Sequence, residues 1–234
     1  SSGHYIASRI PGHPLQEYVY LLIYDASPFV WNLLSAIFGG LAAVFFLLSV
    51  KKLCPETAWG AALALAFVPV IYVAGTYTAD YTWTLAFTMF AFYLLLERKY
   101  FWCGVVIGMA TGCRITSIAL LLPFLFLLFD KKQLPLFIRH AMQLVVPAVV
   151  VSVLWYVPSY LNHGSSFFGY SDQFPYPPFA KIVYKATLGV FGLLGFIALS
   201  AGVLAGLRCW QRKEIRETTL FPVNRLLWMC LMVV

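Results

Sequence analysis

Charged residues are scarce in this sequence. Only 11% of its 234 residues are Asp, Glu, Lys or Arg, whereas about a quarter are charged in a soluble globular domain. Hydrophobic residues make up 62% of the chain, which leaves most of it unsuited to water. The shortage of charge therefore excludes an ordinary soluble domain, and it makes the length of the apolar runs the next question.

Paired cysteine motifs are also missing. None of the five cysteines forms a CxxC pair, and most of them lie in or beside apolar runs. The spacing therefore indicates neither a disulfide framework nor a zinc site. We interpret the cysteines as small buried hydrophobic residues.

Several apolar runs reach the roughly 20 residues that a helix needs to cross a bilayer. The sequence predicts an all-α, polytopic transmembrane bundle that forms one domain over residues 1–234. We expect an outer loop at 1–30 with an interfacial helix at 15–25, membrane helices over 31–234, and a second outer loop at 159–180. The expected spans are 31–50, 57–75, 81–96, 141–158, 182–207 and a last one from about 221. The chain begins without Met and ends inside an apolar run, so we expect further helices at both ends.

The apolar stretch 101–129 is ambiguous, because its 29 residues fit one long tilted helix or two short ones. Charge decides between them. A single helix would separate Lys131 and Lys132 from the basic pairs that follow the other spans, whereas a hairpin breaking near Arg114 returns them to the same side. We predict the hairpin, with Arg114 at its outer tip.

With this topology, each basic residue can be assigned to one side of the membrane. The formal net charge is +7, but the basic residues stand in short clusters between apolar runs, as in cytoplasmic loops, so we expect no nucleic acid as partner. Four basic residues fall outside, namely Arg9, Arg114, Lys181 and Lys185. The other twelve of the sixteen fall inside, which predicts an integral, multi-pass membrane protein with its active face on the extracytoplasmic side.

Asp80 is the principal candidate for a catalytic residue, because a carboxylate with apolar flanks near the hydrocarbon boundary is costly to retain. It can serve as a general base, a metal ligand or an acceptor for sugar hydroxyls. An interfacial Asp that caps the helix starting at Tyr81 explains the residue equally well. Both interpretations stay open.

Arg114 is the candidate for phosphate binding, since its guanidinium has five donors in a rigid fork. Its alternative is a structural role, bonding carbonyls that the helix break frees. Arg9, with His4 and His13, can form a polar rim for an anionic leaving group, although solvated loop residues of these types usually have no such role. Glu17 belongs to the same outer segment.

The outer loop near Tyr170 is rich in aromatic residues and proline. Aromatic faces stack on the C–H face of a sugar or against an acyl chain. The alternative is an aromatic belt at the membrane interface.

Three segments resemble the GT-C superfamily of polytopic glycosyltransferases, nearest to the protein O-mannosyltransferases. PGHPL at 11–15 is similar to the PGxPL element of the first outer loop. NLLSA at 32–36 is similar to the start of the following helix, and GMATGCRITS at 108–117 to a broken helix pair with a basic residue at the break.

The resemblance implies transfer of a sugar from a polyprenyl-phosphate-linked donor to an acceptor protein or glycan. It also implies a catalytic acidic residue in the first outer loop, which would precede Ser1. Asp80 matches a second acidic residue and Arg114 the residue near the lipid phosphate, with Arg9, His13, Glu17 and Tyr170 as further substrate-binding candidates. A divalent cation, Mg²⁺ or Mn²⁺, can assist the phosphate leaving group.

Two other classes compete with this interpretation. A secondary transporter or flippase would line a pathway with Asp80 and Arg114, but it predicts inverted repeats and midplane ionisable residues, and no repeat is visible. A non-catalytic membrane scaffold subunit would tolerate the loss of both side chains.

Overall fold

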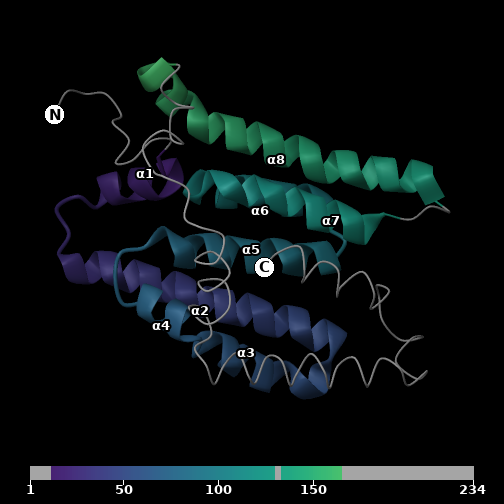
Figure 1. Cartoon of the computed structure of the whole chain (residues 1–234), viewed down its shortest axis with the longest axis horizontal. Coiled ribbons are helices and arrows are strands. Elements are labelled where there is room, and N and C mark those ends of the chain that lie inside the picture. The colour runs from purple at the N-terminus through teal and green to yellow at the C-terminus, as the bar shows by residue number, and fades with distance from the viewer. Residues whose placement is uncertain (1–11, 130–132, 165–234) are drawn as a thin grey trace, which may run out of the picture.

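The computed structural model describes residues 12–129 and 133–164 (Figure 1). Within these ranges it is all-helical, which confirms the predicted all-α class. Its elements are α1 (Pro14–Leu22), α2 (Pro28–Leu53), η1 (Pro55–Thr57), α3 (Ala58–Ala66), α4 (Pro69–Ala74), α5 (Asp80–Leu96), α6 (Tyr100–Cys113), η2 (Ile115–Leu120), α7 (Leu121–Leu128) and α8 (Leu134–His163). The spans expected at 182–207 and from 221 lie outside the described residues, as do Arg9 and Tyr170.

Two of the described helices are long and apolar enough to cross a membrane, namely α2 and residues Leu134–Leu161 of α8. Their most apolar windows are only 17% and 33% buried within the described structure. The core helix of a soluble protein would be mostly buried, so the two helices favour association with a membrane.

The stretch 101–129 is a hairpin, as its flanking charges predict. The ring of Tyr100, at the start of α6, lies 4.3 Å from that of His140, and Phe129, after α7, lies 5.2 Å from Phe137. The beginning and the end of the stretch therefore both contact the first turns of α8. The chain reverses between α6 and η2, at Arg114, and Figure 1 shows α6 and α7 beside α8.

The span expected at 57–75 is wrong as a single helix. It is divided into α3 and α4, which meet at Phe67 and Val68. Pro69 follows, and a proline disfavours helical geometry at the residue before it. Val68 accordingly has ψ 122°, and Pro69 begins α4 at a position where its missing N–H costs little.

The helix expected to end at Pro158 instead continues to His163, and residues 159–163 are helix rather than outer loop. Pro147 and Pro158 both lie inside α8. A proline in a helix removes one i→i−4 hydrogen bond, but the helix can continue where neighbouring groups satisfy the freed carbonyl.

The turn between α5 and α6 is a Schellman motif. The Lys99 N–H donates to the Leu94 carbonyl and the Arg98 N–H to the Leu95 carbonyl, both at 3.0 Å. Arg98 has φ 59°, and it is the sole non-glycine residue with positive φ in the described ranges. Glycine is the usual residue here, because a side chain in this conformation costs about 1 kcal/mol. The backbone of Arg98 is therefore strained.

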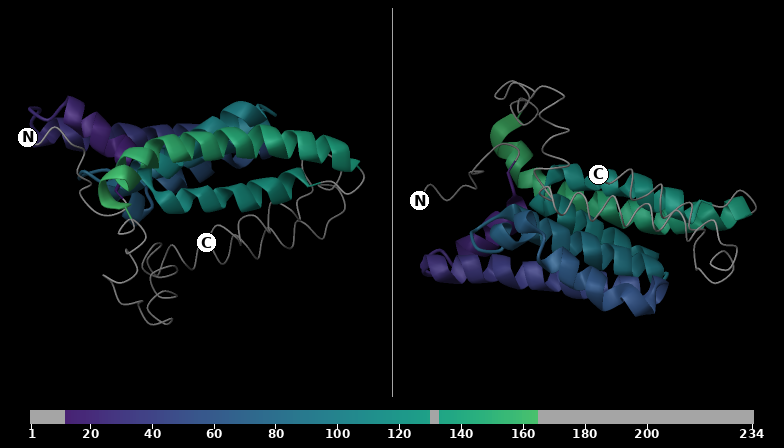
Figure 2. Two further views of the ribbon diagram at one scale, coloured as in Figure 1. Left: turned by 90° about the horizontal axis from the view of Figure 1, so that it is seen from above. Right: turned by 60° about the horizontal axis from the view of Figure 1, so that its bottom comes forward.

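The teal hairpin of α6, η2 and α7 lies beside the green helix α8 (Figure 2). Helices α6 and α8 pack very closely along a row of glycines on α6. Gly104, Gly108 and Gly112 follow one another at four-residue intervals on one face of α6. A Cβ atom at Gly104 would collide with the Leu144 carbonyl oxygen, and one at Gly112 would lie 2.8 Å from the Trp155 ring. Small residues at this spacing allow two membrane helices to approach closely, which fixes the position of the hairpin tip.

We expect Gly108→Ala to lower the free energy of unfolding by about 1–3 kcal/mol through overpacking, because the added Cβ would lie 2.5 Å from Val151 Cβ. Thermal unfolding in detergent, followed by the reactivity of the buried thiols of Cys103 and Cys113, measures the change. Gly60→Ala is the matched control, since a Cβ there meets nothing within 4 Å. Equal stability of the Gly108 variant and wild type would contradict the close contact.

Candidate functional site

Asp80 and Arg114 form an ion pair at the end of the bundle where α5 begins and α6 ends. Arg114 Nε lies 3.3 Å from Asp80 Oδ2. The guanidinium carbon also lies 4.3 Å from the ring centroid of Tyr81. The two residues singled out in the sequence are thus neighbours, although they belong to different helices.

The helix break determines where Arg114 lies. α6 ends at Cys113, and Arg114 is extended, with φ −148° and ψ 120°. Its N–H donates to the Ala110 carbonyl, and its own carbonyl accepts from Ser117. The partners of its side chain in the described structure are Asp80 and Tyr81, which differs from the alternative in which it bonds carbonyls freed at the break.

His13 bonds the carbonyl freed at the break. Its Nδ1 lies 2.6 Å from the Cys113 carbonyl oxygen and 3.8 Å from Asp80 Oδ2. A carbonyl oxygen only accepts, so Nδ1 carries the proton, and in the neutral ring Nε2 then has the lone pair. His13 therefore links the chain before α1, the end of α6 and the start of α5.

The PGHPL segment explains how His13 reaches this position. Gly12 has φ 93°, a conformation that glycine adopts readily. Pro14 is the first residue of α1, where proline is favoured. Leu15 is buried against Trp83 and Cys113. The turn, the helix start and the buried anchor together direct the histidine to Asp80.

Asp80 is the first residue of α5, and the N-cap position belongs to Ala79. The interpretation of Asp80 as a helix cap is therefore not supported. Two contacts from α2 hold the loop before it: Thr78 Oγ1 donates to Asn32 Oδ1 at 2.9 Å, and Ser35 Oγ accepts from the Ala79 N–H at 3.4 Å. The NLLSA segment thus positions the carboxylate.

A cavity of about 450 Å³ opens beside Asp80. Most of its lining surface is apolar, and we call it the polar cavity after the polar side chains among its lining residues. It lies between α1, the start of α2 and the loop before α5. Its lining residues are His13, Gln16, Glu17, Tyr20, Leu21, Trp31, Thr78 and Asp80. Arg114 does not line the cavity and contacts Asp80 from behind it.

Aromatic rings form one wall of this cavity. Tyr20 and Trp31 are stacked with centroids 5.3 Å apart. Gln16 Nε2 donates to Tyr20 Oη at 2.9 Å, and Trp31 Nε1 donates to the Ile23 carbonyl at 3.1 Å. These bonds hold both rings in place, so the cavity combines a fixed aromatic surface with a carboxylate and an imidazole.

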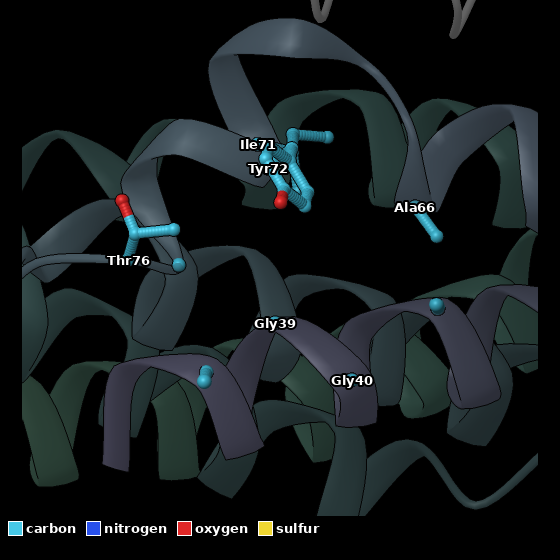
Figure 3. Close-up of a pocket in the computed structure, with 9 residues that line it drawn as sticks. Gly39, Gly40, Ala66, Ile71, Tyr72 and Thr76 are labelled. Atoms are coloured by element: carbon cyan, nitrogen blue, oxygen red, sulfur yellow. The ribbon is translucent and has the colours of Figure 1, made fainter. Parts of the chain in front are cut away.

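A second cavity of about 230 Å³ lies between α2 and the α3–α4 segment (Figure 3). Its lining is almost wholly apolar and includes the small residues Gly39, Gly40 and Ala66. Both cavities are bordered by α2 and by the loop between α4 and α5. This second cavity, which we call the apolar groove, therefore borders the same two segments as the polar cavity.

The structure brings together four of the candidates from the sequence: His13, Glu17, Asp80 and Arg114. The residues that sequence reasoning missed are Gln16, Tyr20, Trp31, Thr78, Asn32 and Ser35. Asn32 and Ser35 could have been found from the sequence, because they are polar residues on one face of an apolar helix. The aromatic wall could not, because its members come from two helices.

Within the described ranges, no group of three or more His, Cys, Asp and Glu side chains is arranged to hold a metal ion. The predicted use of Mg²⁺ or Mn²⁺ stays a prediction.

Comparison of the chain with protein-family models, with curated proteins and with solved structures gave no match.

The Asp80–Arg114 pair should appear as an energetic coupling in a double-mutant cycle. We expect Asp80→Asn and Arg114→Gln to be coupled by about 1 kcal/mol in thermal unfolding, because both charges are only partly solvated. Pairing Asp80→Asn with Lys51→Gln, at the opposite end of the bundle, should give additive effects. Additivity in both cycles would mean that the ion pair does not form.

Proposed function

We propose that this chain is the transmembrane part of a glycosyltransferase that transfers a sugar from a polyprenyl-phosphate-linked donor to an acceptor on the extracytoplasmic face. The observation that carries the proposal is the polar cavity itself. It combines Asp80, His13 and an aromatic wall with a neighbouring apolar groove, at one end of a helical bundle.

The distribution of charge over the two ends supports the orientation. Among the described residues, the end with the cavity has one basic side chain and three acidic ones, which are Arg114, Glu17, Asp25 and Asp80. The opposite end has five basic and two acidic side chains, which are Lys51, Lys52, Arg98, Lys99, Arg139, Glu56 and Glu97. Basic residues mark the cytoplasmic side of membrane proteins. This distribution supports the proposed multi-pass arrangement with the cavity on the extracytoplasmic side.

The contents of the cavity suit a reaction at a sugar. The C–H face of a hexose can lie on the Tyr20–Trp31 wall. In the transfer step, the bond from the anomeric carbon to the phosphate oxygen breaks, and a bond from that carbon to the acceptor oxygen forms. The acceptor hydroxyl gives up its proton, and the Asp80 carboxylate is positioned to accept it.

Arg114 has a positioning role in this scheme. Its guanidinium contacts Asp80 from outside the cavity, so it fixes the direction of the carboxylate. The apolar groove along α2 suits the polyprenyl chain of the donor, because it is lined by small residues that leave room for a lipid. Positive charge for the phosphate leaving group is expected from Arg9.

The proposal is tested by the rate of sugar transfer in the full-length protein, reconstituted in vesicles with a polyprenyl-phosphate-linked sugar and an acceptor. We expect Asp80→Asn to lower the rate about 100-fold or more, as for the loss of a general base. Glu97→Gln is the matched control, because Glu97 is also paired with a cation but lies at the opposite end. Its rate should equal that of the wild type.

Thermal unfolding of both variants separates chemistry from folding. An Asp80→Asn protein that is folded and transfers sugar at the wild-type rate would refute the catalytic proposal and leave a scaffold subunit as the better explanation. A wild-type protein without transferase activity on any lipid-linked sugar would refute it as well.

A further inference from the structure

The turn between α5 and α6 carries two cations, Arg98 and Lys99, and neither forms an ion pair within the described residues. The acid that precedes them, Glu97, is already engaged, because Lys52 Nζ lies 2.6 Å from its Oε1. The bond from Lys52 holds the pKa of Glu97 below its usual value, so this carboxylate is ionised and paired. Arg98 and Lys99 are both exposed.

A third cation, Arg139, lies at the same end. It precedes His140, whose ring lies 4.3 Å from Tyr100 at the start of α6. Arg139 is exposed, and no ion pair involves it within the described ranges. Two helices therefore present positive charge to one region of the surface, around the α5–α6 turn.

The backbone at Arg98 gives an independent indication. Its positive φ suits glycine, yet an arginine is present. Strained residues of this kind are concentrated at sites where the side chain has a task. A guanidinium at a turn that would be more stable with glycine points to a ligand for the guanidinium.

Exposed aromatic residues indicate what that ligand is. Phe101 and Trp102 lie two and three residues after Lys99. They are 54% and 59% exposed and make an edge-to-face contact. Cations next to exposed tryptophans are typical of the level of lipid headgroups, where the ring enters the boundary with the acyl chains. A soluble phosphate would give no reason for the aromatic pair.

We propose that Arg98, Lys99 and Arg139 bind the phosphate of an anionic phospholipid on the cytoplasmic side of the membrane, with Trp102 against the glycerol and upper acyl region. The guanidinium forks of Arg98 and Arg139 match the phosphate oxygens. The site rests on the membrane orientation proposed above, but it does not depend on sugar transfer. It lies at the end of the bundle opposite the polar cavity.

The test uses the full chain, purified and placed in nanodiscs or mixed micelles of phosphatidylcholine with increasing phosphatidylglycerol. Bound lipid is counted by native mass spectrometry. Arg98→Gly should weaken the binding of phosphatidylglycerol about fivefold, the effect expected for one cation at a membrane surface. In phosphatidylcholine alone the same variant should unfold at the same or a higher temperature, because glycine relieves the strained turn.

Lys51→Gln is the matched control, since it removes one positive charge at the same end but outside the three-residue site. It should keep wild-type affinity within twofold. Equal losses for Lys51→Gln and Arg98→Gly would show a diffuse attraction and overturn the site. Unchanged affinity of Arg98→Gly, no preference for phosphatidylglycerol over phosphatidylcholine, or equal competition by glycerol 3-phosphate would overturn it too. Loss of sugar transfer in the Asp80 variant bears on none of these results.

Discussion

The reversal of the chain at Arg114 is the constraint on which the rest of the structure depends. One continuous helix over 101–129 would extend about 43 Å, and its two ends could not both meet the first turns of α8. The break frees the Cys113 carbonyl, which accepts a hydrogen bond from His13, and it directs Arg114 to Asp80. The hairpin, the ion pair and the anchoring of α1 are thus consequences of a single break.

The break is stable because α8 supports it. Tyr156 donates from α8 to the Thr111 carbonyl at 2.8 Å, close to the end of α6. The glycines of α6 bring that end against Trp155. Close packing between two helices therefore holds an irregular piece of backbone that a bilayer would not tolerate if it were exposed to lipid. The same packing holds the polar cavity next to a rigid support.

The two ends of the bundle are built for different surroundings. One end has a half-buried carboxylate, an imidazole and an aromatic wall around a cavity. The other has the exposed cations Arg98 and Lys99 close in sequence to the exposed Trp102. This polarity agrees with the proposed orientation, in which the proposed reaction site and the proposed lipid contact lie at opposite ends of one helical body.

Charge and proline patterns show which helix boundaries and turns could be predicted from the sequence. The basic clusters were sufficient to predict the hairpin over 101–129, because the side of the membrane on which a loop is expected depends on its own lysines and arginines. The division of α3 from α4 was also within reach, since Pro69 restricts Val68. The continuation of α8 past Pro158 was not, because a proline can end a helix or remain inside it. Packing and the surrounding solvent decide between the two outcomes.

The sequence by itself determined the helical class, the apolar character of the chain, the turn at Arg114 and the choice of Asp80 and Arg114 as unusual residues. Each of these follows from composition or from neighbours along the chain. Only the tertiary structure decided that His13 bonds the Cys113 carbonyl, that Tyr20 and Trp31 form a wall, and that Arg114 contacts Asp80 from behind the cavity. These contacts join separate helices, and their geometry depends on how closely the helices pack.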